Sequence, residues 1–211
     1  MASDFHPADA RGSLRESRRI NVVGTSGSGK STFSRDLARA LELPCHEMDA
    51  HFWLPGWHGR ADGDFLARIA ALTSGDVWVL DGNYTRTTPV KWARVECVVW
   101  LDYSLPVTLF RAVRRAIGRA ISKKEVWPGT GIRESFRQSF LSRKSILLWT
   151  LRTHGTNRRK YAALLQADQP FRWIRIRRPR DAKALLVALR SPASPGDLVA
   201  EGGFEPPTKG L

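Results

Sequence analysis

Short apolar runs alternate with amphipathic stretches along residues 19–190. Most of the runs are continuous, which is typical of strands buried on both faces of a parallel sheet. Five strands are predicted, at Arg19–Val23, Leu43–Met48, Val77–Leu80, Cys97–Leu101 and Phe171–Ile176.

Between the runs, apolar residues recur every three or four positions, which predicts helices. Strands that alternate with helices predict an α/β fold, in which helices cover both faces of a parallel sheet. The predicted helices span residues 32–42, 62–73, 105–121 and 181–189, with two more, one ending near Thr153 and one at 161–165, separated by a basic turn.

The two ends of the chain lack this periodicity. Residues 1–18 are poor in apolar side chains, so we expect a flexible N-terminus. Residues 191–211 are rich in proline and glycine, so we expect a disordered tail, and the sequence leaves open whether residues 201–211 belong to the folded protein. Residues 19–190 form one domain, in which residues 50–60 are predicted to be an aromatic-rich loop.

The 211 residues contain no pattern that predicts membrane insertion or secretion. No apolar run approaches the roughly 20 residues that span a bilayer, and residues 1–16 lack the apolar centre of a secretory signal. Cys45 and Cys97 both lie in strand-like runs and are expected to be reduced thiols. We therefore expect a cytoplasmic protein with no membrane partner.

Charge is distributed unevenly along the chain. Lysine and arginine number 34 against 20 acidic residues, a net charge of +14. Of these basic residues, 19 lie between Arg111 and Arg180, where there are three acidic ones. This basic block predicts an anionic partner, and composition does not decide between a polyphosphate substrate and nucleic acid.

The octapeptide at residues 24–31 adds a specific anion site. Gly-Thr-Ser-Gly-Ser-Gly-Lys-Ser matches the phosphate-binding P-loop at every fixed position, between a predicted strand and a predicted helix. Its glycines let backbone N–H groups turn toward an anion, and the helix adds its positive end. A flexible Gly/Ser turn is the alternative, but the flanking strand and helix favour phosphate binding. The predicted nucleotide-binding residues are Gly24, Thr25, Ser26, Gly27, Ser28, Gly29, Lys30, Ser31, Thr32 and Arg177.

Oxygen ligands for Mg²⁺ are also present. The Ser31 hydroxyl is one, and an aspartate at the end of an apolar strand is the usual partner at a P-loop. Asp81 and Asp102 both follow such strands. Because the carboxyl ends of parallel strands share one edge of a sheet, either carboxylate could serve, and either could instead cap a turn.

A basic face marks the helix predicted at residues 105–121. Arg111, Arg115 and Arg119 recur every four positions, a spacing at which like charges repel, so a solvated face is the ordinary explanation. Further basic residues flank a Pro/Gly break downstream of the P-loop. We therefore predict a lid at about residues 118–140, whose arginines contact phosphate oxygens.

Several motifs together resemble the adenylate-kinase-like "topology modulation" proteins, over roughly residues 19–190. The most specific is Asp81-Gly82-Asn83-Tyr84 after an apolar strand, and the others lie at residues 24–31, 48–49, 53–57, 99–102 and 111–115. The resemblance implies a P-loop nucleoside-monophosphate-kinase fold with sheet order 2-3-1-4-5, an acceptor region and a lid. It also implies that Asp81 organises Mg²⁺ and that Arg86 contacts phosphate. The family's name implies an effect on DNA topology.

These observations predict an ATP-dependent, Mg²⁺-requiring phosphotransferase that resembles adenylate kinase and acts on an unknown acceptor. The acceptor would bind at about residues 49–73, where Asp49 could orient or deprotonate a hydroxyl or could merely cap a turn. The alternative is a regulatory ATP-binding protein whose basic block grips DNA. The predicted catalytic residues are Lys30, Asp49, Arg86, Arg115 and Arg119, and the predicted Mg²⁺ ligands are Ser31 and Asp81.

Overall fold

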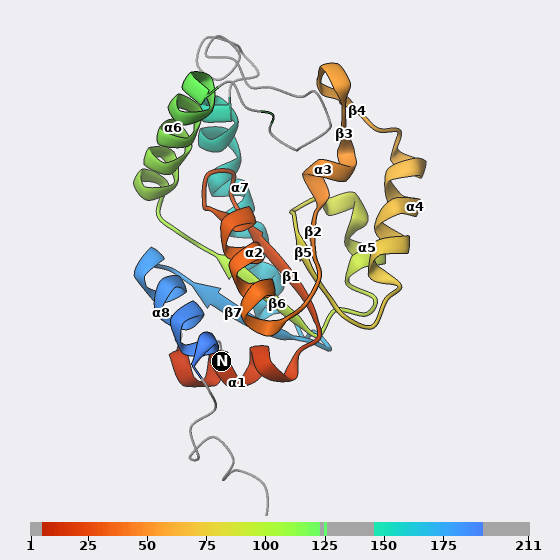
Figure 1. Cartoon of the computed structure of the whole chain (residues 1–211), viewed down its shortest axis with the longest axis vertical. Coiled ribbons are helices and arrows are strands. Elements are labelled where there is room, and N and C mark those ends of the chain that lie inside the picture. The colour runs from red at the N-terminus through yellow and green to blue at the C-terminus, as the bar shows by residue number, and fades with distance from the viewer. Residues whose placement is uncertain (1–5, 123–124, 126–145, 192–211) are drawn as a thin grey trace, which may run out of the picture.

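A five-stranded parallel sheet forms the centre of the computed structural model, which describes residues 6–122, 125 and 146–191 (Figure 1). Its strands are β1 (Arg19–Gly24), β2 (Cys45–Glu47), β5 (Trp78–Asp81), β6 (Cys97–Leu101) and β7 (Arg172–Ile176). They lie in the order β2-β5-β1-β6-β7, which is 2-3-1-4-5 when these five strands are numbered along the chain. The predicted α/β fold with a parallel sheet is confirmed.

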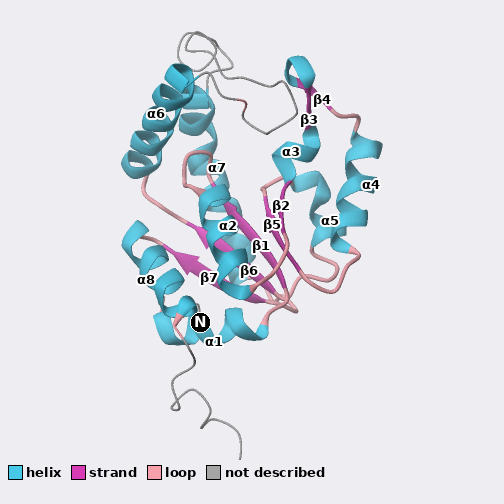
Figure 2. Ribbon diagram, in the orientation of Figure 1, coloured by secondary structure: helices cyan, strands magenta, loops and turns pink. Residues whose placement is uncertain are grey.

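Helices cover both faces of the sheet (Figure 2). Helices α1 (Pro7–Glu16), α2 (Lys30–Leu41) and α8 (Pro179–Arg190) pack on one face. Helices α4 (Asp62–Thr73), α5 (Thr88–Lys91) and α7 (Ile146–Gln166) pack on the other, and α6 (Leu105–Ser122) lies against α7. Among the described residues, no helix is both long enough and apolar enough to cross a membrane.

Strand β6, near the middle of the sheet, is apolar throughout because both of its faces are core. In β6, Val99 and Leu101 enter the layer beneath α1, α2 and α8, whereas Val98 and Trp100 enter the opposite layer. All five residues of this strand are buried. Each large apolar side chain removed from water contributes roughly 1.5–3 kcal/mol, so these two layers supply much of the free energy of folding.

Helix α1 contradicts, over Pro7–Glu16, the flexible N-terminus predicted for residues 1–18, of which residues 1–5 lie outside the described part of the chain. Ala10 and Leu14 lie one turn apart on α1, and both are buried in the layer that contains α8. The Arg15 guanidinium donates a hydrogen bond to the Leu189 carbonyl, near the end of α8, at 3.3 Å. The prediction was wrong because it relied on average apolar content, whereas two apolar side chains at helical spacing suffice to anchor a short helix.

The aromatic-rich segment at residues 50–60 is more regular than predicted. Its first residues end the helix α3 (Met48–Phe52). An antiparallel hairpin follows, in which the turn η1 (Pro55–Trp57) joins β3 (Trp53–Leu54) to β4 (His58–Gly59). Gly56 supplies the φ of 74° at this turn, a value that glycine adopts without strain.

Two other predictions concern the second half of the chain. Helix α7 is continuous, although the sequence predicted two helices separated by a basic turn. The predicted lid, about residues 118–140, starts on the last turn of α6 and otherwise lies outside the described residues, apart from Glu125. The predicted tail lies outside them from residue 192 onward.

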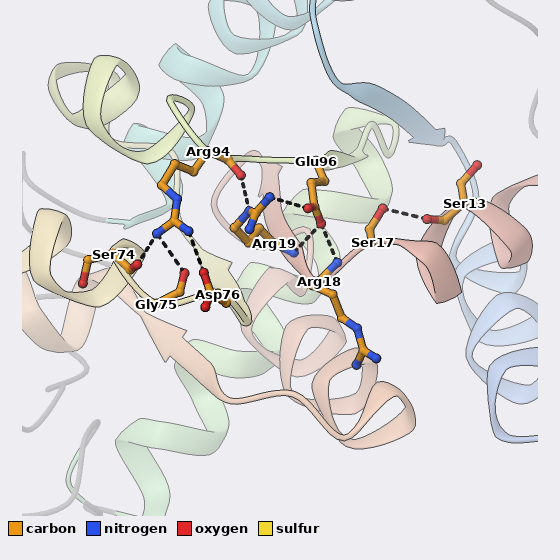
Figure 3. Close-up of polar contacts among 9 residues, drawn as sticks. All are labelled: Ser13, Ser17, Arg18, Arg19, Ser74, Gly75, Asp76, Arg94 and Glu96. Atoms are coloured by element: carbon orange, nitrogen blue, oxygen red, sulfur yellow. Dashed lines mark hydrogen bonds and ion pairs between the residues drawn. The ribbon is translucent and has the colours of Figure 1, made fainter.

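Charged side chains tie together the amino-terminal ends of the strands, at the edge away from the P-loop (Figure 3). Glu96 accepts hydrogen bonds from the backbone N–H groups of Arg18 (2.6 Å) and Arg19 (3.1 Å), and it also pairs with the Arg19 guanidinium. Arg19 Nε donates to the Arg94 carbonyl at 2.6 Å, and Arg94 pairs with Asp76 at 2.7 Å. These contacts hold the start of β1 against the segments that lead into β5 and β6.

We expect Glu96→Ala to lower the free energy of unfolding by roughly 1–3 kcal/mol, because three donors lose a charged acceptor. Nucleotide affinity should not change, since Glu96 lies at the edge away from the P-loop. Urea denaturation followed by tryptophan fluorescence measures the first effect, and calorimetry measures the second. Asp168→Ala, which removes an exposed carboxylate, is the control. A Glu96→Ala protein as stable as its parent would show that these contacts contribute nothing.

Candidate active site

The P-loop joins β1 to α2 in a tight curve. Gly27 and Gly29 have φ values of 86° and 87°, in the left-handed region where other residues are strained. Space is limiting as well, because a Cβ on Gly27 would lie 2.7 Å from the Thr108 carbonyl oxygen and 2.9 Å from the Ala112 Cβ, both on α6. The loop therefore needs glycine at position 27 both for its curve and for its contact with α6.

Lys30, the first residue of α2, folds back over this loop, and its Nζ lies 3.4 Å from the Thr25 carbonyl oxygen. Burial is the strongest influence on the ammonium group and lowers its pKa. The Asp81 and Asp49 carboxylates raise the pKa, and the Arg115 guanidinium lowers it. Three other predicted site residues, one arginine and two aspartates, thus influence the Lys30 ammonium by their charge.

Asp81 ends β5 and is buried. Burial raises the pKa of its carboxyl to about 6, and the nearby Lys30 ammonium and a hydrogen bond from the Ser31 hydroxyl oppose that shift. Its Oδ1 has no hydrogen-bond partner within the part of the chain that the structure describes. An unpartnered buried oxygen is costly, and a divalent cation would remove that cost. A carboxylate and a hydroxyl are the hard oxygen ligands that Mg²⁺ takes, so the residues fit this ion.

Asp102, the other strand-end aspartate, is instead neutralised within the fold. Its Oδ2 accepts hydrogen bonds from the Arg175 Nε and Nη2 atoms at 2.9 and 2.5 Å, and its Oδ1 lies 3.2 Å from the Arg158 Nε. The Arg175 guanidinium also stacks over the Trp100 ring, 4.5 Å from its centroid. This aspartate therefore links β6, β7 and α7, and two arginines already neutralise its charge.

Asp49 lies exposed in the first turn of α3. Its Oδ1 accepts a hydrogen bond from the Tyr84 hydroxyl at 2.6 Å. Burial and the adjacent Asp49 carboxylate raise the pKa of Tyr84, so the phenol stays protonated and acts as the donor. The His46 and His51 rings lie 6.4 Å apart in the same region, and burial lowers both of their pKa values.

Arg86 has partners of its own in the region predicted to bind the acceptor. Its guanidinium lies 4.7 Å from the centroid of the Phe52 ring and 5.4 Å from that of Phe65, and it pairs with Asp62 at 3.1 Å. The Tyr84 ring completes this cluster at 5.6 Å. Arg86 thereby joins α3 and α4 to the loop after β5, a contact that the sequence did not predict.

The other predicted arginines are placed differently. Arg111 donates a hydrogen bond to the Ser28 carbonyl of the P-loop at 3.0 Å, so α6 is attached to this loop. Arg119 lies on α6, but its side chain is outside the described residues. Arg177 follows β7 and is exposed.

Helix α7 brings to the P-loop edge of the sheet polar side chains that were not among the predicted site residues. Thr150, His154 and Arg158 recur every four residues and so share one face of the helix. The Thr150 hydroxyl donates to the Ser26 carbonyl at 3.4 Å, and the His154 Nε2 lies 3.0 Å from the Tyr103 carbonyl oxygen. The regular spacing of these polar residues was a signal that could have identified the face.

The five-stranded parallel sheet, the glycine-rich loop between β1 and α2 and the helices on both faces form an α/β fold that is also found in solved small-molecule kinases. Shikimate kinase from Acinetobacter baumannii, solved in complex with shikimate, has this fold: it is 16% identical over 87% of this chain and 96% of its own, with a TM-score of 0.53. A gluconokinase from Sinorhizobium meliloti 1021 is 20% identical over 82% of this chain and 93% of its own, with a TM-score of 0.45.

Sequence comparisons add no closer relationship. No family model matches the chain, and no curated protein is detectably similar in sequence. The resemblance to the topology modulation proteins is therefore not confirmed. At the identities above, the likeness to solved structures shows the fold alone.

Proposed function

We propose that this chain is an ATP-dependent, Mg²⁺-requiring kinase that phosphorylates a small molecule. The observation that carries the proposal is the buried Asp81 Oδ1, which has no partner among the described residues and lies in a carboxylate bonded to the Ser31 hydroxyl and facing the Lys30 ammonium. Such an arrangement lowers the stability of the free protein, and a cation that binds together with a nucleotide would give the buried oxygen a partner. The fold shared with shikimate kinase supports the same class of reaction.

The P-loop would hold ATP by its phosphates, against its backbone N–H groups and the positive end of α2. Ser31 and Asp81 would hold Mg²⁺, which supplies positive charge to the phosphate oxygens when it is bound. Lys30 would neutralise the oxygens of the phosphoryl group that moves, and Arg115, whose charge lowers the pKa of Lys30, would act with it. Arg177, exposed after β7, would frame the base.

The acceptor would bind beside Asp49. Because the Tyr84 hydroxyl occupies Oδ1, the Oδ2 atom is left to accept a hydrogen bond from the acceptor hydroxyl and to orient its oxygen toward the phosphoryl group. The cluster of Phe52, Phe65 and Arg86 would support this region from behind. Shikimate kinase, by its description, binds shikimate, which supports a small-molecule acceptor here as well.

Several arginines of the basic block are used inside the fold. Arg111 bonds to the P-loop, and both Arg158 and Arg175 pair with Asp102. The kinase proposal explains this part of the charge excess by contacts at the site, and no observation favours a nucleic-acid partner. We propose a cytoplasmic protein that takes its phosphoryl group from ATP.

A screen of nucleosides, nucleotides and small hydroxylated metabolites for ADP formation tests the proposal. We expect one chemical class to stimulate turnover in the presence of Mg²⁺. Asp49→Asn should then lower turnover by roughly 10²–10⁴-fold without weakening ATP binding, because the group that orients the acceptor is lost. Asp168→Asn, which removes an exposed carboxylate beyond the end of α7, is the control. A protein that neither binds ATP nor responds to any acceptor would refute the proposal.

A further inference from the structure

The segment Gly82–Tyr84, which follows Asp81, contacts separate parts of the site. The Gly82 carbonyl accepts a hydrogen bond from the Lys91 Nζ at 3.0 Å, and the Tyr84 hydroxyl donates to Asp49. Between them, the Asn83 side chain reaches the other way, to the P-loop. Its Nδ2 donates to the Gly24 carbonyl at 2.5 Å, and its Oδ1 accepts from the Gly24 N–H at 3.0 Å.

The Asn83 amide thus binds both main-chain polar groups of one residue. A carboxamide carries a donor and an acceptor side by side, so it matches the N–H and C=O of Gly24 in the way a neighbouring strand would. Gly24 is both the last residue of β1 and the first residue of the P-loop. A side chain of different chemistry at position 83, such as a carboxylate or an alkyl group, could not make both bonds.

This contact begins where the backbone pairing of the two strands ends. The register of β1 and β5 runs to the pair Val22 and Asp81, and the Gly82 N–H still donates to the Val22 carbonyl at 3.2 Å. Beyond that point the chain turns away, and Asn83 continues the link to Gly24 through its side chain. Asp81 therefore lies between the β1–β5 strand pairing that precedes it and the link from Asn83 to Gly24 that follows it.

We infer that Asn83 is a positioning residue of the proposed kinase, which fixes the P-loop in register with the strand end that carries Asp81. It sets the placement of the Asp81 carboxylate relative to Ser31, and hence the geometry offered to Mg²⁺. The inference rests on the proposed function, because it takes Asp81 as a ligand of the metal that accompanies ATP. Removal of groups that orient metal ligands typically lowers metal affinity by roughly 10–100-fold.

The test compares ATP binding across a Mg²⁺ titration for the parent and for Asn83→Ala, by calorimetry on the full chain. We expect the Mg²⁺ concentration at half-maximal ATP binding to rise about tenfold or more, while ATP affinity without metal changes less than threefold. Hydrogen exchange without nucleotide should show faster exchange of the Gly24 amide. Asn83→Ser, which is too short to meet both Gly24 groups, replaces Asn83→Ala if that variant does not fold.

Trp92→Phe is the matched control. The Trp92 indole donates to the Asn21 side chain at 2.8 Å, and Asn21 donates in turn to the Leu80 carbonyl at 2.8 Å. Losing that bond should cost stability in the same buried polar network without touching the P-loop. We expect Trp92→Phe to melt at a lower temperature than the parent and to reach half-maximal ATP binding at the same Mg²⁺ concentration.

The outcomes separate this inference from the proposed function. A parent that binds no ATP overturns both. A parent that binds ATP, with an Asn83→Ala midpoint within twofold of its own, overturns the positioning role and leaves the kinase proposal in place. Equal losses of ATP affinity with and without Mg²⁺ also overturn it, because they would mean that Asn83 only stiffens the P-loop.

Discussion

Lys30→Ala should abolish tight ATP binding and leave the fold intact. The Lys30 ammonium is held over the P-loop and faces two carboxylates, so its removal takes positive charge from the place where the outer phosphates would lie. Loss of one preorganised charge contact of this kind typically costs about 10²–10³-fold in turnover. Calorimetry at fixed Mg²⁺ concentration measures binding, and circular dichroism reports the fold.

Lys183→Ala supplies the comparison for that result. Lys183 is exposed on α8, and its replacement removes the same charge at a position that the proposed mechanism does not use. We expect this protein to bind ATP with the parent's affinity. If Lys30→Ala bound ATP equally well, the P-loop could not be the nucleotide site.

The two strand-end aspartates should respond to amide substitution in opposite ways. Asp81→Asn removes the proposed Mg²⁺ ligand, so the Mg²⁺ concentration needed for ATP binding should rise sharply. Asp102→Asn instead breaks the pairing with Arg175 and Arg158 and should destabilise the fold, on the order of 3 kcal/mol, with a mild effect on the Mg²⁺ requirement. Mg²⁺ titrations and urea denaturation of both variants decide the matter. If Asp102→Asn raised the Mg²⁺ requirement more than Asp81→Asn, the metal ligand would be Asp102 and the proposal would name the wrong strand.

The pH dependence of stability gives a second measure of Asp81. Burial raises its pKa from 3.8 to about 6 in the folded protein, so the folded state binds a proton more tightly than the unfolded state. The ligand-free parent should therefore lose stability as the pH rises from about 4 through about 6. Asp81→Asn lacks this titration and should be the more stable protein at pH 7, by up to about 3 kcal/mol, and equal to the parent near pH 4. A constant difference across this range would show that the carboxyl is not buried in solution.

Much of the sheet and the glycine-rich loop at residues 24–31 could be predicted from the sequence because each depends on local constraints. A continuous apolar run such as Cys97–Leu101 fits a strand covered on both faces, and few other places in a soluble fold accept it. The glycines of residues 24–31 have a local reason, such as the positive φ that Gly29 adopts at a fixed position of the motif.

The local pattern alone did not distinguish the two aspartates, because Asp81 and Asp102 each follow an apolar strand, and only the family resemblance favoured Asp81. They differ in their distant partners: Arg175, which pairs with Asp102, lies 73 residues further along the chain. The hydrogen bond from Tyr84 to Asp49, which spans 35 residues, was missed for the same reason. A pattern read along the chain carries no information about which charges meet across the fold.

The packing of α1 against α8 has a practical consequence for work with this protein. α1 ends just before β1 begins, and α8 runs back from the end of β7, so both helices finish at the edge of the sheet away from the P-loop. The Arg11 guanidinium bonds to the Ser191 carbonyl at 3.2 Å, which brings residues 180 positions apart into contact. A fluorophore pair on α1 and α8 would therefore report unfolding of the whole domain, while remaining silent to events at the nucleotide site.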